Sequence, residues 1–169
     1  IYYLDSDDEI YPTTILDLIK ISKQYPDAEI IQGKTFSNQN QEYYNYQPSQ
    51  LYLTNNKEIQ NVFYTTNFPI NAWNKLIKKD FIVKNNLNFK EGIIHEDELW
   101  CFFTIKKLTS IAFSQEYTYK HYIREGSIMT INNQNRSSIN WAIILTEIFN
   151  YKEKTIFIEQ TIKKYIPLY

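Results

Sequence analysis

The residues best suited to chemistry form an acidic cluster at the start of the chain. The cluster consists of Asp5, Ser6, Asp7 and Asp8, and it follows the apolar run 1–4. If that run is a buried strand, the cluster lies outside a strand's carboxyl end, where α/β sheets bind ligands. Adjacent carboxylates repel each other, and a hard divalent cation offsets this cost. The pattern therefore predicts a Mg²⁺ or Mn²⁺ site for a diphosphate, with an acidic turn before a helix as the open alternative.

Two other metal-dependent classes fit the cluster less well. An EF-hand loop that begins at Asp5 requires Gly at its sixth position and Glu at its twelfth, where the chain has Ile10 and Leu16. A phosphatase of the haloacid-dehalogenase type also begins with Asp-x-Asp after a strand. It would need a small turn residue and Thr next, which the chain does not supply, so it remains only a weaker alternative.

A second acidic cluster comprises Glu96, Asp97 and Glu98, directly after His95. Acids at a helix start favour the macrodipole, so a charged first turn is one interpretation. The other is a partly buried carboxylate that acts as a base. Sugar transfer needs both a base for the attacking hydroxyl and a cation on the leaving diphosphate, so the two clusters together would form a complete site.

Four segments in this order resemble family-2 glycosyltransferases, which are GT-A-fold enzymes of bacterial polysaccharide synthesis. The segments span residues 3–8, 73–76, 92–98 and 124–129 and read YLDSDD, WNKL, GIIHEDE and REGSIM. The resemblance covers residues 1–129, and the remainder matches only as a generic helical tail. It implies an α/β fold, a truncated GT-A mixed sheet flanked by helices, with a helical tail.

The resemblance also implies roles for the acids. Asp7 is the expected main metal ligand, with Asp5 nearer the nucleotide ribose. Asp8 either orients this site or replaces Asp7 as the ligand. Asp97 corresponds to the catalytic base, and Glu96 to a neighbouring acid that supports it or contacts the acceptor.

Other residues are expected to contact either the acceptor or the sugar-nucleotide donor. Trp73, Asn74 and His95 are candidates for the acceptor side, although Trp73 fits a core position equally well. Lys75 and Arg124 are candidates for contact with the donor. A guanidinium suits a diphosphate, whereas Lys75 could instead pair with a site carboxylate or be solvated.

The resemblance implies an inverting, metal-dependent transfer from a nucleotide-diphospho-sugar, a UDP-sugar, to a hydroxyl of a glycan acceptor. Capsule or lipopolysaccharide synthesis is the expected setting, in the cytoplasm or peripherally at the inner face of the plasma membrane. A glycosyltransferase-like module that binds glycan without catalysis is the alternative. It would not need the acids of either cluster.

Composition agrees with a folded domain. The 169 residues are 43% hydrophobic and 22% charged, which is typical of a globular chain. The net charge of -1 gives no basic excess for nucleic acid. Three glycines are too few for a Gly-rich phosphate loop, and the single Cys101 excludes an internal disulfide.

The acids must be positioned by alternating strands and helices. Strands are expected at 1–4, 29–36, 111–113 and 117–123. Helices are expected at 12–25, 55–64, 78–85, 96–108, 137–150 and 155–165. Residues 1–130 are expected to be the C-terminal part of a GT-A domain, with 131–169 as a helical tail packed on it. Nucleotide-binding strands are expected upstream, so the isolated chain should bind sugar nucleotide weakly and be inactive.

Overall fold

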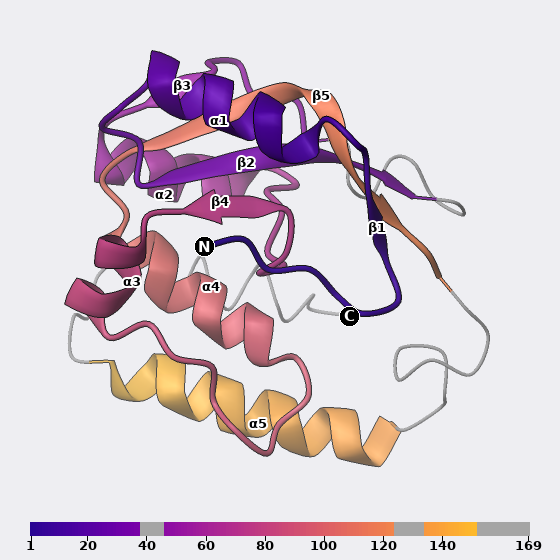
Figure 1. The fold of residues 1–169 in the computed structure, drawn as a ribbon. Helices are drawn as coiled ribbons and strands as arrows, with labels where there is room; N and C mark the ends of the chain where they lie inside the picture. The colour runs from indigo at the N-terminus through magenta and orange to yellow at the C-terminus, as the bar shows by residue number, and fades with distance from the viewer. Residues whose placement is uncertain (38–45, 124–133, 152–169) are drawn as a thin grey trace.

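The computed structural model describes residues 1–37, 46–123 and 134–151 (Figure 1). A mixed five-stranded sheet lies at its centre, with β2 and β5 paired in parallel. The other described strands are antiparallel to their neighbours, β4 on β2 and both β1 and β3 on β5. The strand bounds are β1 Glu9–Ile10, β2 Ile30–Ser37, β3 Tyr52–Leu53, β4 Lys75–Ile77 and β5 Ile111–His121.

Helices cover both faces of this sheet (Figure 1). On one face, α1 packs Leu18 against Ile31 of β2 and Ala112 of β5. On the other face, α2, α3 and α4 form a larger core with the sheet, and α5 packs on the outer side of α4. The helix bounds are α1 Thr14–Gln24, α2 Asn56–Thr65, α3 Lys79–Asn85, α4 Glu96–Lys107 and α5 Gln134–Asn150.

Strand β2 and helix α4 are each buried on more than one side. Strand β2 has helices on both of its faces, so side chains of either orientation are excluded from water. Helix α4 lies between the sheet and α5, and it buries residues on most of its circumference. Its buried residues are Leu99, Trp100, Cys101, Phe102, Thr104 and Ile105.

One close approach in the sheet requires glycine. A Cβ atom on Gly33 would lie 1.9 Å from Thr118 Oγ1 and 2.3 Å from Asn74 Oδ1. The backbone nitrogen of Gly33 also donates to the Asn74 carbonyl over 2.9 Å. Gly33 therefore allows the segment before β4 to lie directly against the middle of the sheet.

The predicted α/β class and most predicted elements are confirmed. The structure has helices at each of the first five expected positions and a strand at 30–37. The expected helix at 155–165 lies outside the described residues. Residues 111–121 form a single strand where two were expected, and β1, β3 and β4 were not predicted.

The prediction of a buried strand at 1–4 is wrong. Within this run only Tyr2 forms a β-bridge, to Leu76. Ile1 and Ile77 exchange two hydrogen bonds, in which the nitrogen of each residue donates to the carbonyl of the other. Ile1 and Leu4 are 44% and 48% exposed. The run lies beside β4 at the edge of the sheet, and within the described part of the chain these two apolar side chains stay partly exposed.

Within the described segments, no helix is both long enough and apolar enough to cross a membrane.

Candidate active site

The first acidic cluster forms a compact group of oxygen atoms. Asp5, Asp7 and Asp8 each offer one carboxylate oxygen, and these atoms lie within 4.8 Å of one another. Asp5 and Asp7 are exposed and Asp8 is half-buried. A backbone hydrogen bond of 3.2 Å from Asp8 N to Asp5 O closes the turn. Hard divalent cations bind oxygen ligands, so this donor set fits Mg²⁺ or Mn²⁺.

Residues in and directly after β5, more than a hundred positions later in the sequence, form hydrogen bonds with this turn. The Tyr119 hydroxyl donates to Asp8 Oδ2 over 2.8 Å and accepts from Asp5 N over 3.2 Å. The backbone nitrogen of Tyr122 donates to Asp8 Oδ1 over 2.9 Å. Both oxygens of Asp8 therefore have hydrogen-bond donors in the protein.

The second cluster occupies the first turn of α4. His95 precedes the helix in the left-handed conformation, with φ 66°, and Glu96, Asp97 and Glu98 follow it. Asp97 Oδ1 accepts from the backbone nitrogen of Glu98 over 3.0 Å. Burial is the main reason that the pKa of Asp97 is raised above its ordinary value, and neighbouring Glu96 adds to this rise.

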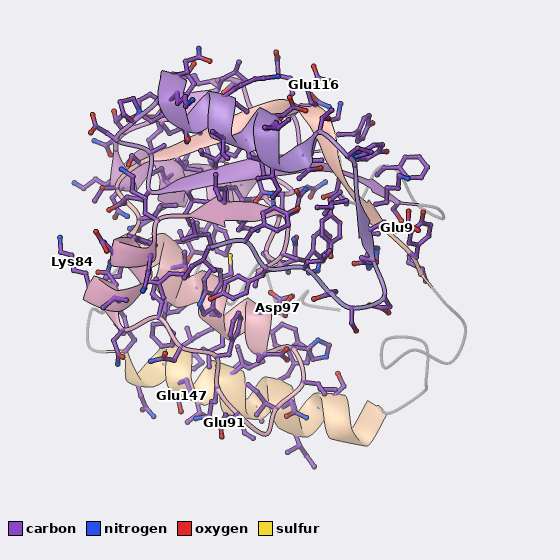
Figure 2. The ribbon with its side chains drawn as sticks, viewed as in Figure 1. Glu9, Lys84, Glu91, Asp97, Glu116 and Glu147 are labelled. Atoms are coloured by element: carbon purple, nitrogen blue, oxygen red, sulfur yellow. The ribbon has the colours of Figure 1, made fainter. Side chains whose placement is uncertain are left out.

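The two clusters face each other. The pKa of Asp5 is raised to about 6, first by partial desolvation and then by the charges of Asp8, Asp7, Asp97 and Glu96. Figure 2 shows Asp97 at the beginning of α4, close to the N-terminal segment. The charges of Asp97 and Glu96 thus act on Asp5 although about ninety positions separate them in the sequence.

Lys75 lies behind Asp97, within the protein. Its side chain is fully buried on β4, and its ammonium group donates to the Asn71 carbonyl. Burial lowers the pKa of Lys75 to about 8, while Cys101 and Asp97 act in the opposite direction. The solvated alternative for this residue is therefore wrong, because the 2% exposure of Lys75 leaves no room for a water shell. The Lys75 charge in turn lowers the pKa of Asp97.

The three acceptor-side candidates have different surroundings. Trp73 is 7% exposed and stacks on Tyr119, with ring centroids 4.3 Å apart, and on His121 at 5.3 Å. Asn74 is buried in the left-handed conformation, with φ 57°. His95 stacks on Trp141 of α5, with centroids 5.4 Å apart.

Asn74 links three segments through its side chain. Its Oδ1 accepts from Thr118 Oγ1 over 2.7 Å and from the Tyr2 hydroxyl over 3.2 Å. Its Nδ2 donates to Thr35 Oγ1 over 3.0 Å. These contacts give Asn74 an internal structural function. Arg124, the remaining donor-side candidate, lies outside the described residues.

Tyr119 is the site residue that sequence reasoning did not find. It lies near the C-terminal end of β5 with 0% exposure, and its hydroxyl contacts both Asp5 and Asp8. From the sequence, a tyrosine in an apolar strand is predicted to be a core residue. Its residue type alone does not indicate which group its hydroxyl contacts.

Comparison with known proteins finds similarity to glycosyltransferases. No family model matches the chain. It is 22% identical over 159 residues to "Uncharacterized glycosyltransferase YibD" of Escherichia coli, covering 90% of this chain and 46% of that protein. It is 25% identical over 99 residues to the cholesterol galactosyltransferase of Borreliella burgdorferi, covering 52% of this chain and 27% of that protein. The chain thus spans less than half the length of either curated relative.

Solved structures agree on the fold. The S. aureus TarS 1–349 structure in complex with UDP-GlcNAc superposes with a TM-score of 0.64 at 18% identity, covering 96% of this chain and 48% of that one. A second structure of TarS 1–349 superposes with a TM-score of 0.66 at 14% identity, covering 99% of this chain and 47% of that one. The chain therefore has the mixed α/β glycosyltransferase fold seen in TarS, and its homologues are glycosyltransferases.

Proposed function

We propose that this chain carries the catalytic centre of a glycosyltransferase that moves a sugar from a UDP-sugar to a hydroxyl of a glycan acceptor. The observation that carries the proposal is the compact carboxylate group of Asp5, Asp7 and Asp8, with Asp97 close to the N-terminal segment that bears it (Figure 2). The charges of Asp97 and Glu96 also raise the pKa of Asp5. The structural neighbour TarS is solved with UDP-GlcNAc and with UDP, which supports a UDP-sugar donor. Glycosyltransferase homologues in two bacteria support sugar transfer, and synthesis of a bacterial surface polysaccharide is the proposed setting.

In the proposed reaction, Asp97 accepts the proton of the acceptor hydroxyl while that oxygen attacks the anomeric carbon. The bond from the anomeric carbon to the diphosphate oxygen breaks on the opposite face, so the anomeric configuration inverts. The raised pKa of Asp97 makes its carboxylate a stronger base than an ordinary exposed aspartate, while the nearby charge of Lys75 limits that rise.

Asp7 and Asp5 would hold a Mg²⁺ or Mn²⁺ ion, which when bound neutralises the charge of the departing nucleoside diphosphate. The oxygen-rich donor set of the turn supports this assignment. Synthesis of a surface polysaccharide from a nucleotide sugar would take place in the cytoplasm or at the inner face of the plasma membrane.

The test is Asp97→Asn in the full-length protein, with Glu91→Gln as a matched control. Glu91 is an exposed acid in the loop before α4, so its substitution removes the same charge away from the two clusters. Transfer from UDP-sugars to glycan acceptors is measured, and the anomeric configuration of the product is read by NMR. We expect Asp97→Asn to lower kcat by at least about 100-fold.

Near-normal transfer by Asp97→Asn would exclude Asp97 as the base. A product with retained configuration would exclude the single-displacement mechanism. Glycan binding without transfer by the unaltered protein would favour the non-catalytic module instead.

A further inference from the structure

The contacts between β5 and the acidic turn separate the three aspartates by role. Asp8 has a hydrogen-bond donor on each carboxylate oxygen, the Tyr119 hydroxyl at 2.8 Å and Tyr122 N at 2.9 Å. Tyr119 lies in β5 and Tyr122 directly follows the end of that strand, 111 and 114 residues after Asp8 in the sequence. The Asp8 side chain is thereby oriented toward the strand.

The Tyr119 ring is itself held in place, which makes its hydroxyl a defined anchor. It is fully buried and stacks on Trp73 with centroids 4.3 Å apart and planes 12° apart. Its hydroxyl also accepts from Asp5 N over 3.2 Å, so one oxygen atom contacts both ends of the turn. A site group is positioned accurately when the residues that support it are locked by packing.

We propose that Tyr119 and Asp8 form a latch that positions the metal-binding turn, and that Asp8 supports Asp5 and Asp7 instead of being the principal ligand. This inference rests on the proposed function, because it assigns the cation to Asp5 and Asp7. Tyr119 is then a positioning residue: it acts on the cation through the shape of the turn and does not touch the donor.

The test uses Tyr119→Phe, which removes only the hydroxyl and keeps the ring stacked on Trp73. Tyr122→Phe is the matched control, because it removes a hydroxyl three residues away, whose 3.2 Å partner is exposed Glu9, and keeps the Tyr122 backbone donor. Asp8→Asn and Asp7→Asn complete the set. A carboxamide at position 8 can still accept from Tyr122 N, so Asp8→Asn preserves much of the latch.

Two readouts are measured on the full-length protein. The first is hydrogen exchange of the Asp5 and Tyr122 backbone amides without metal. The second is Mn²⁺ affinity by electron paramagnetic resonance with UDP present. For Tyr119→Phe we expect faster exchange at Asp5 and a loss of Mn²⁺ affinity of about 10- to 100-fold, as for other residues that orient metal ligands. Tyr122→Phe should leave both readouts unchanged.

The aspartate variants test the division of roles. Asp7→Asn should abolish Mn²⁺ binding, whereas Asp8→Asn should weaken it by less than about 10-fold, since it loses mainly a neighbouring charge. Equal losses in Asp8→Asn and Asp7→Asn would overturn the inference, as would unchanged Asp5 exchange or unchanged Mn²⁺ affinity in Tyr119→Phe.

Failure of the proposed function gives a different pattern. If the unaltered protein bound Mn²⁺ and responded to these substitutions as expected but transferred no sugar, the proposed reaction would be wrong and the latch would stand. If it bound no Mn²⁺ with UDP present, the cation site and the role assigned to the latch would both be overturned.

Discussion

Asp97 and Lys75 illustrate how opposing effects act on a single carboxylate. Burial and the charge of Glu96 raise the pKa of Asp97, whereas the Glu98 backbone donor and the Lys75 ammonium lower it. A base must be ionised at the working pH and still basic enough to accept a proton. Lys75 provides a buried positive charge on the protein side of Asp97 and so keeps the carboxylate ionised at lower pH.

Lys75→Met should therefore raise the pKa of Asp97 further. A base with a higher pKa becomes ionised only at higher pH, so the acid limb of the kcat/KM profile should move to higher pH, and activity should recover as the pH rises. The measurement is the pH dependence of transfer by the full-length protein. Lys79→Met is the control, since Lys79 is exposed at the start of α3.

An unshifted acid limb with uniformly lower activity would show that Lys75 serves the fold and not the ionisation of Asp97. A shift of the limb to lower pH would contradict the sign of the interaction itself.

Among the elements, the helices were predictable and the short strands were not. Helices such as α1 repeat apolar residues at helical spacing over three turns, which a sequence reveals directly. Strands β1 and β3 have two residues each, and they exist only because β5 lies beside them. Strand β4 contains buried Lys75, and a lysine does not indicate a core strand.

The same physical limit applies to the site. Asp5, Asp7 and Asp97 were expected to work together because the proposed chemistry needs both a cation site and a base. Tyr119 could not be singled out, because the chain contains 15 tyrosines and its partner Asp8 is 111 positions away. Hydrogen bonds between distant segments depend on the packing of the whole sheet, which local patterns do not encode.

Gly33→Ala tests the closest contact between elements. The new methyl would overlap Thr118 Oγ1 and Asn74 Oδ1 at 1.9 and 2.3 Å, so β2, β5 and the segment before β4 would have to separate. Overpacking of this kind costs about 1–3 kcal/mol or more in the free energy of unfolding. The measurement is urea denaturation.

Gly92→Ala is the informative comparison. Gly92 has φ 80°, and apart from Gly92 and its two chain neighbours no atom of the described residues lies within 4 Å of the position that a methyl group would take there. Only backbone strain of about 1 kcal/mol is therefore expected. A loss of stability in Gly33→Ala no greater than in Gly92→Ala would contradict the close packing.

At the scale of the whole molecule, the described elements form a series of layers from α1 to α5 (Figure 1). Helix α1, the sheet, helix α4 and then α5 follow one another (Figure 1), and the catalytic candidate Asp97 begins the helix between the sheet and α5. Ile144 and Ile148 of α5 are each 1% exposed and pack with Leu99 and Phe102 of α4. Burial on both sides fixes the position of α4 relative to the acidic turn.

Ile148→Ala should destabilise the protein by about 2–5 kcal/mol, because it leaves a cavity between α5 and α4. Ile139→Ala on the same helix should change stability by less than about 0.5 kcal/mol, since Ile139 is 63% exposed. Chemical denaturation of the two variants measures the difference. Equal effects would mean that α5 does not pack on α4 as described.

The connection between the acidic turn and β5 also determines when the site can form as the protein folds. The turn begins at residue 5, yet its hydrogen-bond partners are at residues 119 and 122. Contacts between such distant positions close a long loop, so they form slowly and depend on cooperative folding of the segments between them. During synthesis, the acidic turn leaves the ribosome more than a hundred residues before its anchor. The three carboxylates therefore acquire their final arrangement only after β5 has been made and has docked beside β2.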